Sequence, residues 1–213
     1  VVPMTEVFTV KRAGDGTIER FKVRLCVRGD LEKWWARPHD TTSPVLSAET
    51  LRLVCAVVST KPTYRMWQVD YTQAYTNAEL PTGREVYIRF PDGIMGSSRE
   101  HPQHARLRKS LYGLVDAGYR WYTTLSEQLI GYGLKRSADD LCLFTQLKGD
   151  EVILIVVVWV DDLLITGQEH AGIHLLRFLE GNYPLHKDAP SIFLGLRIQR
   201  EECTGAVTIN QSR

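Results

Sequence analysis

The sequence lacks the features that mark several protein classes. Its four cysteines are far apart and form no Cys-x-x-Cys pair, which argues against a disulfide framework or a zinc site and favours a reducing compartment. The longest apolar run, residues 152–160, is too short to span a bilayer, and no signal peptide opens the chain. We therefore expect an intracellular protein without a membrane partner. Nothing in the sequence distinguishes a cytoplasmic particle from the nucleus.

The chain also lacks a strong net charge. Its formal charge is +1, so its overall composition does not indicate a nucleic-acid-binding protein. The hydrophobic fraction of 44% and the charged fraction of 24% are typical of a globular domain and not of a disordered chain. The cations are unevenly distributed, with basic stretches at 11–28 and 106–109. A basic stretch alone is equally consistent with a solvated face.

Hydrophobic periodicity predicts a mixed set of strands and helices. Alternating side chains predict strands, and apolar residues at helical spacing predict helices, the first of them capped by Ser47. The expected strands are 7–10, 21–27, 64–70, 85–90, 152–160, 163–166 and 192–198, and the expected helices follow Ser47, span 121–132 and include 173–179. The first two strands should form a hairpin around Gly-Asp-Gly at 14–16. Without a regular βαβ rhythm, this order predicts an α+β fold with an antiparallel sheet backed by helices.

Two adjacent aspartates, Asp161 and Asp162, separate the two apolar strands of an expected hairpin. Neighbouring carboxylates repel each other, and burial adds a desolvation cost. A divalent cation would offset both costs, because Mg²⁺ prefers hard carboxylate oxygens. The alternative is an exposed acidic turn, and we interpret Asp139 and Asp140 as such a turn or as a helix cap.

A second acidic strand end strengthens the metal hypothesis. Asp70 closes the strand 64–70, and it would meet Asp161 at a sheet edge if the two strands are neighbours. Three carboxylates can hold two Mg²⁺ ions about 4 Å apart, one activating a hydroxyl and the other neutralising the leaving oxygen. That arrangement suits in-line attack on a phosphate.

Ordered motifs along nearly the whole chain resemble the copia-type (Ty1/copia) retrotransposon reverse transcriptase domain. They are KVRLCVRG at 22–29, SPV at 43–45, QVDYTQAYTNAEL at 68–80, EVYI at 85–88, KSLYGL at 109–114, WVDDLLITG at 159–167 and FLGLRI at 193–198. Any one motif would be weak, whereas their ordered succession is specific. The resemblance implies a right-hand polymerase, with fingers and a palm, that adds nucleotides to a primer.

The resemblance also implies roles for individual residues. Asp70, Asp161 and Asp162 would be catalytic metal ligands for Mg²⁺, with Mn²⁺ as the alternative ion. The residues expected to bind the nucleotide are Lys22, Arg24, Tyr71, Tyr75, Tyr112 and Gly113. Tyr75 would exclude a 2′-hydroxyl, with a core aromatic as its alternative interpretation. Lys187 would protonate pyrophosphate, although a surface lysine is its simpler interpretation.

The implied partners are an RNA or DNA template with its primer, deoxynucleoside triphosphates, and thumb and RNase H parts of the same polyprotein. The whole chain, 1–213, would be a reverse transcriptase domain fragment. We expect fingers at 1–60, palm at 61–90, a fingers–palm junction at 91–120, palm at 121–200 and the start of a truncated thumb or connection at 201–213.

Some positions depart from the family pattern. Val115, Asp116 and Gly118 stand where the family shows Lys, Gln and Pro, and Trp159 replaces a tyrosine. An aspartate beside a nucleic-acid channel would reverse the local charge. One alternative is therefore an inactive or decayed transposon remnant that keeps the fold. A second alternative is another Mg²⁺ enzyme on a related palm, such as a nuclease or cyclase, and the fingers motif and Tyr75 argue against it.

Overall fold

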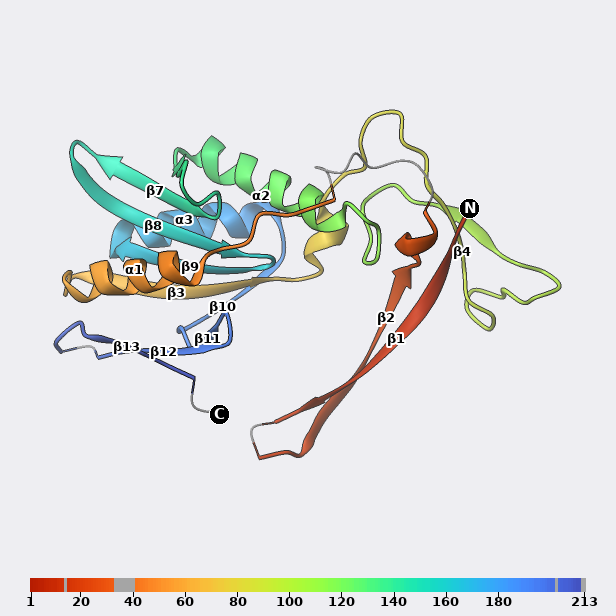
Figure 1. Cartoon of the computed structure of the whole chain (residues 1–213), viewed down its shortest axis with the longest axis horizontal. Helices are drawn as coiled ribbons and strands as arrows, with labels where there is room; N and C mark the ends of the chain where they lie inside the picture. The colour runs from red at the N-terminus through yellow and green to blue at the C-terminus, as the bar shows by residue number, and fades with distance from the viewer. Residues whose placement is uncertain (14, 33–40, 202, 212–213) are drawn as a thin grey trace. The chain divides into compact units, whose positions relative to one another are not determined.

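The computed structural model describes residues 1–13, 15–32, 41–201 and 203–211, and within them the chain divides into two compact units (Figure 1). Unit 1 comprises Val1–Ser43 and Tyr75–Trp121, and unit 2 comprises Pro44–Ala74 and Tyr122–Arg213. Each unit is thus built from segments that are distant in sequence. The division into fingers, palm and junction expected from the sequence stays a prediction.

Unit 1 contains a four-stranded sheet in the order β2-β1-β4-β5. Its strands are β1 (Val2–Arg12), β2 (Ile18–Val27), β4 (Tyr87–Arg89) and β5 (His104–Arg106). The expected first hairpin is confirmed as an antiparallel β1–β2 pair, and only Gly14 of its turn lies outside the described residues. A short 3-10 helix, η1 (Gly29–Leu31), follows β2. Met4, Val27 and Ile88 belong to the buried apolar core of this unit.

Unit 2 contains a six-stranded sheet in the order β10-β3-β9-β8-β7-β6, antiparallel at every pairing. Its strands are β3 (Tyr64–Tyr71), β6 (Lys135–Arg136), β7 (Leu143–Lys148), β8 (Glu151–Trp159), β9 (Asp162–Gln168) and β10 (Leu185–Asp188). The central strands β8 and β9 are buried on both faces, because neighbouring residues such as Val156 and Val157, or Leu163 and Leu164, are all fully covered.

The helices α1 (Ala48–Ser59), α2 (Ala117–Tyr132) and α3 (Glu169–Asn182) match the three predicted helical segments. Ser47 caps α1 as expected, since its side chain accepts a hydrogen bond from the Thr50 amide. Helix α3 contacts β3, β8 and β9. The rings of Tyr132 in α2 and Phe178 in α3 lie 5.0 Å apart. The predicted α+β class, with helices packed on an antiparallel sheet, is therefore confirmed.

A small three-stranded sheet corrects the predicted last strand. Instead of one strand over 192–198, the chain forms β11 (Ile192–Phe193) and β12 (Leu196–Arg200), joined by a turn at Leu194 and Gly195, both at positive φ. Strand β13 (Val207–Asn210) pairs with β12. Turn chemistry interrupted an apolar pattern that alone predicts one strand.

Candidate active site

Two acidic strand ends meet in the six-stranded sheet of unit 2. Strands β3 and β9 are antiparallel neighbours, and their register places Asp70 directly opposite Asp162. Side chains at paired positions project from the same face of a sheet. The carboxylates of Asp70 and Asp162 therefore lie on one face, at the end of both strands.

The turn between β8 and β9 places the third aspartate. Trp159 pairs with Asp162, so the two-residue turn is Val160–Asp161, and Asp162 is already the first residue of β9. This corrects the predicted Asp161–Asp162 tip by one residue. Val160 adopts a φ of 57°, as a tight hairpin turn requires. The Tyr71 amide donates a hydrogen bond to the Asp161 carbonyl (3.1 Å), which fixes the turn against the end of β3.

The electrostatics of this site favour a cation. Partial burial and the negative charges of Asp161 and Asp70 raise the pKa of Asp162 to about 6. In the part of the chain that the structure describes, neither Asp70 nor Asp162 forms an ion pair. Closely spaced carboxylates without a protein cation are a suitable donor set for Mg²⁺, which usually takes one or two carboxylates together with water and substrate phosphates.

The described side chains alone do not complete a metal site. Within the described ranges, no three His, Cys, Asp or Glu side chains are grouped so that they could hold a metal ion by themselves. The backbone carbonyl of Tyr71, water or substrate oxygens would have to supply the remaining ligands. The donor set fits Mg²⁺ bound together with a phosphate substrate better than a permanent structural ion.

The edge strand β10 brings a histidine that sequence reasoning missed. Its register pairs His186 with Asp70, so both side chains project from the same face, and His186 is exposed. Lys187 pairs with Val69 on the opposite face, and its ammonium group forms an ion pair with Glu180 of α3 (2.5 Å). The sequence alone does not predict the register between β10 and β3. The only sequence signal for His186 was therefore its position beside Lys187.

In unit 1, two aromatic residues and one cation of the expected nucleotide-binding set lie together. The ring centroids of Tyr75 and Tyr112 are 4.8 Å apart, and the Arg24 guanidinium lies 5.9 Å from the centre of the Tyr112 ring. Tyr75 is partly buried against the unit 1 core. Lys22 lies on the same face of β2 as Arg24, because the two are separated by one residue.

The turn that carries Tyr112 is held by close backbone packing. The Val27 amide donates a hydrogen bond to the Tyr112 carbonyl (2.7 Å). Gly113 adopts a φ of 91°, and a Cβ there would lie 2.0 Å from the Val27 carbonyl oxygen. A Cβ on Gly29 would lie 2.0 Å from the Gly113 carbonyl oxygen. Gly113 is therefore required by the packing of the turn against the end of β2, whatever it does for a nucleotide.

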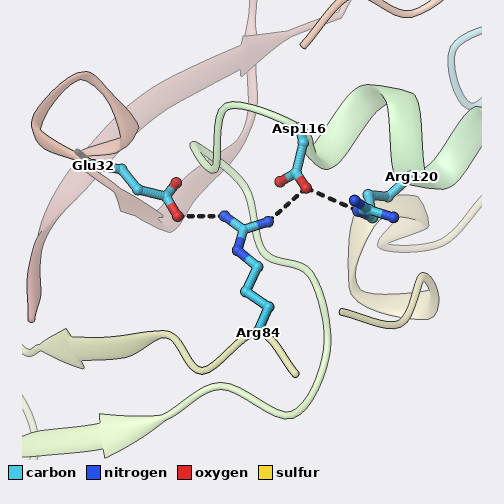
Figure 2. A network of polar contacts seen from close by, with 4 residues as sticks. All are labelled: Glu32, Arg84, Asp116 and Arg120. Atoms are coloured by element: carbon cyan, nitrogen blue, oxygen red, sulfur yellow. Dashed lines mark hydrogen bonds and ion pairs between the residues drawn. The ribbon is translucent and has the colours of Figure 1, made fainter. Parts of the chain in front are cut away.

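A buried ionic network includes Asp116, which follows this turn in the sequence (Figure 2). The Arg84 guanidinium donates to a carboxylate oxygen of Asp116 (2.5 Å) and to Glu32, and Arg120 donates to the same Asp116 oxygen (2.8 Å). The side chains of Arg84 and Asp116 are 0% exposed. Two carboxylates and two guanidinium groups balance in formal charge, so burial leaves no net charge uncompensated.

The network overturns the expectation that Asp116 adds an uncompensated negative charge beside a nucleic-acid channel. Burial alone would lower the pKa of Arg84, but its hydrogen bonds to Asp116 and Glu32 outweigh burial and raise the pKa. Arg120 is the fourth residue after Asp116 and bridges the first turn of α2. Asp116 therefore joins the start of α2 to Arg84 before β4, and its side chain is fully buried.

Comparisons with known proteins extend over the whole chain. The model of the family described as "Reverse transcriptase (RNA-dependent DNA polymerase)" matches residues 1–213. The retrovirus-related Pol polyprotein from transposon RE2 of Arabidopsis thaliana is 32% identical over 198 residues, which cover 91% of this chain and 13% of that polyprotein. The corresponding protein from transposon TNT 1-94 of Nicotiana tabacum is 26% identical over 97% of this chain and 15% of its own length.

The chain is also similar to a yeast polyprotein and to a solved structure. The transposon Ty1-ER2 Gag-Pol polyprotein of Saccharomyces cerevisiae is 28% identical over 84% of this chain and 10% of its own length. The chain thus spans only a small part of its curated relatives. The structure of telomerase from Candida albicans matches with a TM-score of 0.50 and 10% identity, over 99% of this chain and 47% of that chain. At that identity the likeness concerns the fold alone.

Proposed function

The chain belongs to the reverse transcriptase (RNA-dependent DNA polymerase) family, and from that premise we propose that it carries out template-directed DNA synthesis. The substrates would be deoxynucleoside triphosphates and the 3′-hydroxyl of a primer annealed to an RNA or DNA template. The observation that carries the proposal is the pairing of Asp70 with Asp162 on one sheet face, next to the Asp161 turn. The sequence segments that carry these aspartates match the pattern of the copia-type members of the family.

Asp70, Asp161 and Asp162 would hold Mg²⁺, or Mn²⁺ in its place, with the Tyr71 carbonyl as a further oxygen donor. A bound divalent ion lowers the pKa of an attacking hydroxyl and neutralises charge on phosphate oxygens. The protein's own contribution is the fixed geometry of the carboxylates, set by the β3–β9 register and by the Tyr71–Asp161 hydrogen bond. Their mutual repulsion without a cation favours binding of the metal together with the substrate.

We propose His186, and not Lys187, as the proton donor to the leaving pyrophosphate. A donor must lie on the face that carries Asp70 and Asp162, where the register places His186. Lys187 projects toward α3 and is neutralised by Glu180. His186→Gln should lower the rate of nucleotide addition, whereas Lys187→Gln should leave the rate near that of wild type. The reverse result would return the role to Lys187.

For unit 1 we propose nucleotide binding by Lys22, Arg24 and the Tyr112 turn. Guanidinium and ammonium groups match a triphosphate in charge, and Arg is suited to bidentate contact. Tyr75, whose ring packs on Tyr112, would discriminate against a 2′-hydroxyl by occupying the space that the hydroxyl needs. Its partial burial against the core gives the ring little freedom to move aside.

Primer extension on the purified chain tests the proposal. With Mg²⁺ and a primed RNA template, wild type should add templated deoxynucleotides, and Asp161→Asn should not. Activity that survives Asp161→Asn would show that the metal ligands are misassigned. Absence of extension by a folded wild-type chain, in Mg²⁺ and in Mn²⁺, would favour the inactive remnant.

Thumb and RNase H partners and an intracellular location belong to the same proposal. Among the described helices, none is long and apolar enough to cross a membrane.

A further inference from the structure

Most of the β1–β2 hairpin is a two-stranded ribbon. Strand β1 pairs with β4 only at Val2 and Pro3, and from Met4 to Arg12 its partner is β2. An isolated two-stranded ribbon is marginally stable in water unless one of its faces is covered. The composition of the two faces indicates what could cover them.

One face of the ribbon is cationic. The register places Thr5 with Cys26, Val7 with Arg24, Thr9 with Lys22 and Lys11 with Arg20 on this face. These four pairs carry four cations and no carboxylate, and beyond them a register shift leaves Glu19 without a paired position. Lys22 and Arg24 are the residues for which nucleotide binding is proposed, so this face suits a polyanion.

The opposite face is apolar and exposed. It consists of the pairs Glu6–Leu25, Phe8–Val23 and Val10–Phe21, and of Arg12–Ile18 beyond a register shift between Lys11 and Arg12. Phe8 is 72% exposed and Phe21 is 74% exposed, whereas Met4 and Val27, one pair before Glu6 on the same face, are buried in the core. A contiguous exposed apolar patch usually marks a protein-binding surface. Nucleic acid is disfavoured as its occupant, because this face offers Arg12 as its single cation.

The apolar face is complementary to a copy of itself. A two-fold axis between two such faces, running across the strands at the level of Thr9, would stack β1 antiparallel on β1 of the second copy. Phe8 would then lie over Val10 of the second copy, and Phe21 over its Val23, so each large ring meets a smaller side chain. Glu6 would face Arg12 of the second copy, twice in each dimer, as an isologous interface requires.

We propose that this apolar face, made of Glu6, Phe8, Val10, Arg12, Ile18, Phe21, Val23 and Leu25, is a self-association surface for a second copy of this chain. Face-to-face packing of antiparallel sheets tolerates the roughly 30° rotation that strand twist imposes. The guanidinium of Arg12 donates a hydrogen bond to the Gly16 carbonyl (2.9 Å), which holds it at the hairpin end. The cationic face of each copy would remain turned outward.

Sedimentation velocity on the full chain in reducing buffer, over a broad concentration range, tests the proposal. Wild type should show a concentration-dependent dimer, and Phe8→Thr combined with Phe21→Thr should be monomeric. Lys11→Glu, on the cationic face of the same strand, is the matched control and should dimerise like wild type. A wild type that stays monomeric throughout, or a double variant that dimerises like wild type, would overturn the proposal.

A charge-reversal cycle tests the geometry independently. Glu6→Arg or Arg12→Glu alone should weaken dimerisation by about tenfold or more, because each creates two like-charge contacts. The combined Glu6→Arg, Arg12→Glu variant should return to nearly the wild-type dissociation constant. These residues are not in the core, so the fold should persist, which circular dichroism checks. Failure of the combined variant to recover would exclude the antiparallel two-fold packing.

Discussion

The chain contains two groups of carboxylates with opposite surroundings. Asp70 and Asp162 share a sheet face in unit 2, and neither forms an ion pair within the described residues. Asp116 in unit 1 is fully buried and bonds two guanidinium groups through one oxygen. We propose that the first group binds a cation from outside the chain, whereas the second is neutralised by arginines within it. Local counter-charge, more than residue type, therefore separates a candidate reaction site from a structural network.

The largest effect should follow removal of a carboxylate from the first group. Asp70→Asn should lower the rate of nucleotide addition by about a hundredfold to a thousandfold, as loss of a preorganised electrostatic group typically does. Its melting temperature in EDTA should stay level or rise, because repulsion with Asp162 is relieved. Single-turnover primer extension and thermal denaturation measure the two quantities. Asp139→Asn, at an exposed acidic turn, is the control, and equal activity of both variants would contradict the assignment.

Removal of the buried carboxylate should instead affect stability. Asp116→Asn should lower the free energy of unfolding by roughly 3–5 kcal/mol, because Arg84 would keep only one charged partner in a buried site. Denaturant titration followed by circular dichroism measures this loss. Asp139→Asn again serves as the control. If Asp116→Asn were as stable as wild type but inactive, Asp116 would belong with the first group and the comparison would fail.

The pH dependence of stability should sharpen the contrast. The pKa of Asp162 is raised from 3.8 to about 6, so the folded state binds this proton more tightly than the unfolded chain. The contribution of Asp162 is therefore greatest below its unfolded pKa and is lost as the pH rises through about 6. In EDTA, wild type should gain more melting temperature between pH 7 and pH 5 than Asp162→Asn does. Parallel curves would show that Asp162 is not perturbed.

The smallest effect is expected at Tyr75. Tyr75→Val should raise the ratio of ribonucleotide to deoxyribonucleotide incorporation by about tenfold, because the smaller side chain leaves room for a 2′-hydroxyl. Competition assays with matched nucleotides measure the ratio. Phe in place of Tyr75 keeps the ring and should leave the ratio near wild type. An unchanged ratio in the valine variant would support the core-aromatic alternative.

Local signals predicted much of the fold. Alternation, the Ser47 cap and helical spacing located the β1–β2 hairpin, the three helices and the central β8–β9 pair. Each of these signals depends on residues close together in sequence. The break between β11 and β12 was missed because Leu194 adopts a positive φ, and leucine is not a residue that predicts such a turn.

The missed features of the site depend on contacts between distant segments. The placement of His186 opposite Asp70 is a matter of strand register, and neither residue predicts it alone. The ionic partners of Asp116 are Arg84 and Arg120, and the sequence around Asp116 does not show that Arg84 lies beside it. The motif around Asp161 and Asp162 was recognisable because its residues are consecutive.

The close contact between the Gly29 and Gly113 segments limits which substitutions a retrotransposon can accumulate in this domain. Each glycine lies against a main-chain carbonyl, and a backbone atom cannot be made smaller by a second substitution elsewhere. The charge of Asp116 is compensated by the side chains of Arg84 and Arg120, whereas no side-chain change elsewhere could compensate for a Cβ at either glycine. We therefore expect substitutions to be tolerated more readily at Val115 and Asp116 and to be excluded at either glycine. Loss of one of the pair would mark a copy whose product can no longer fold.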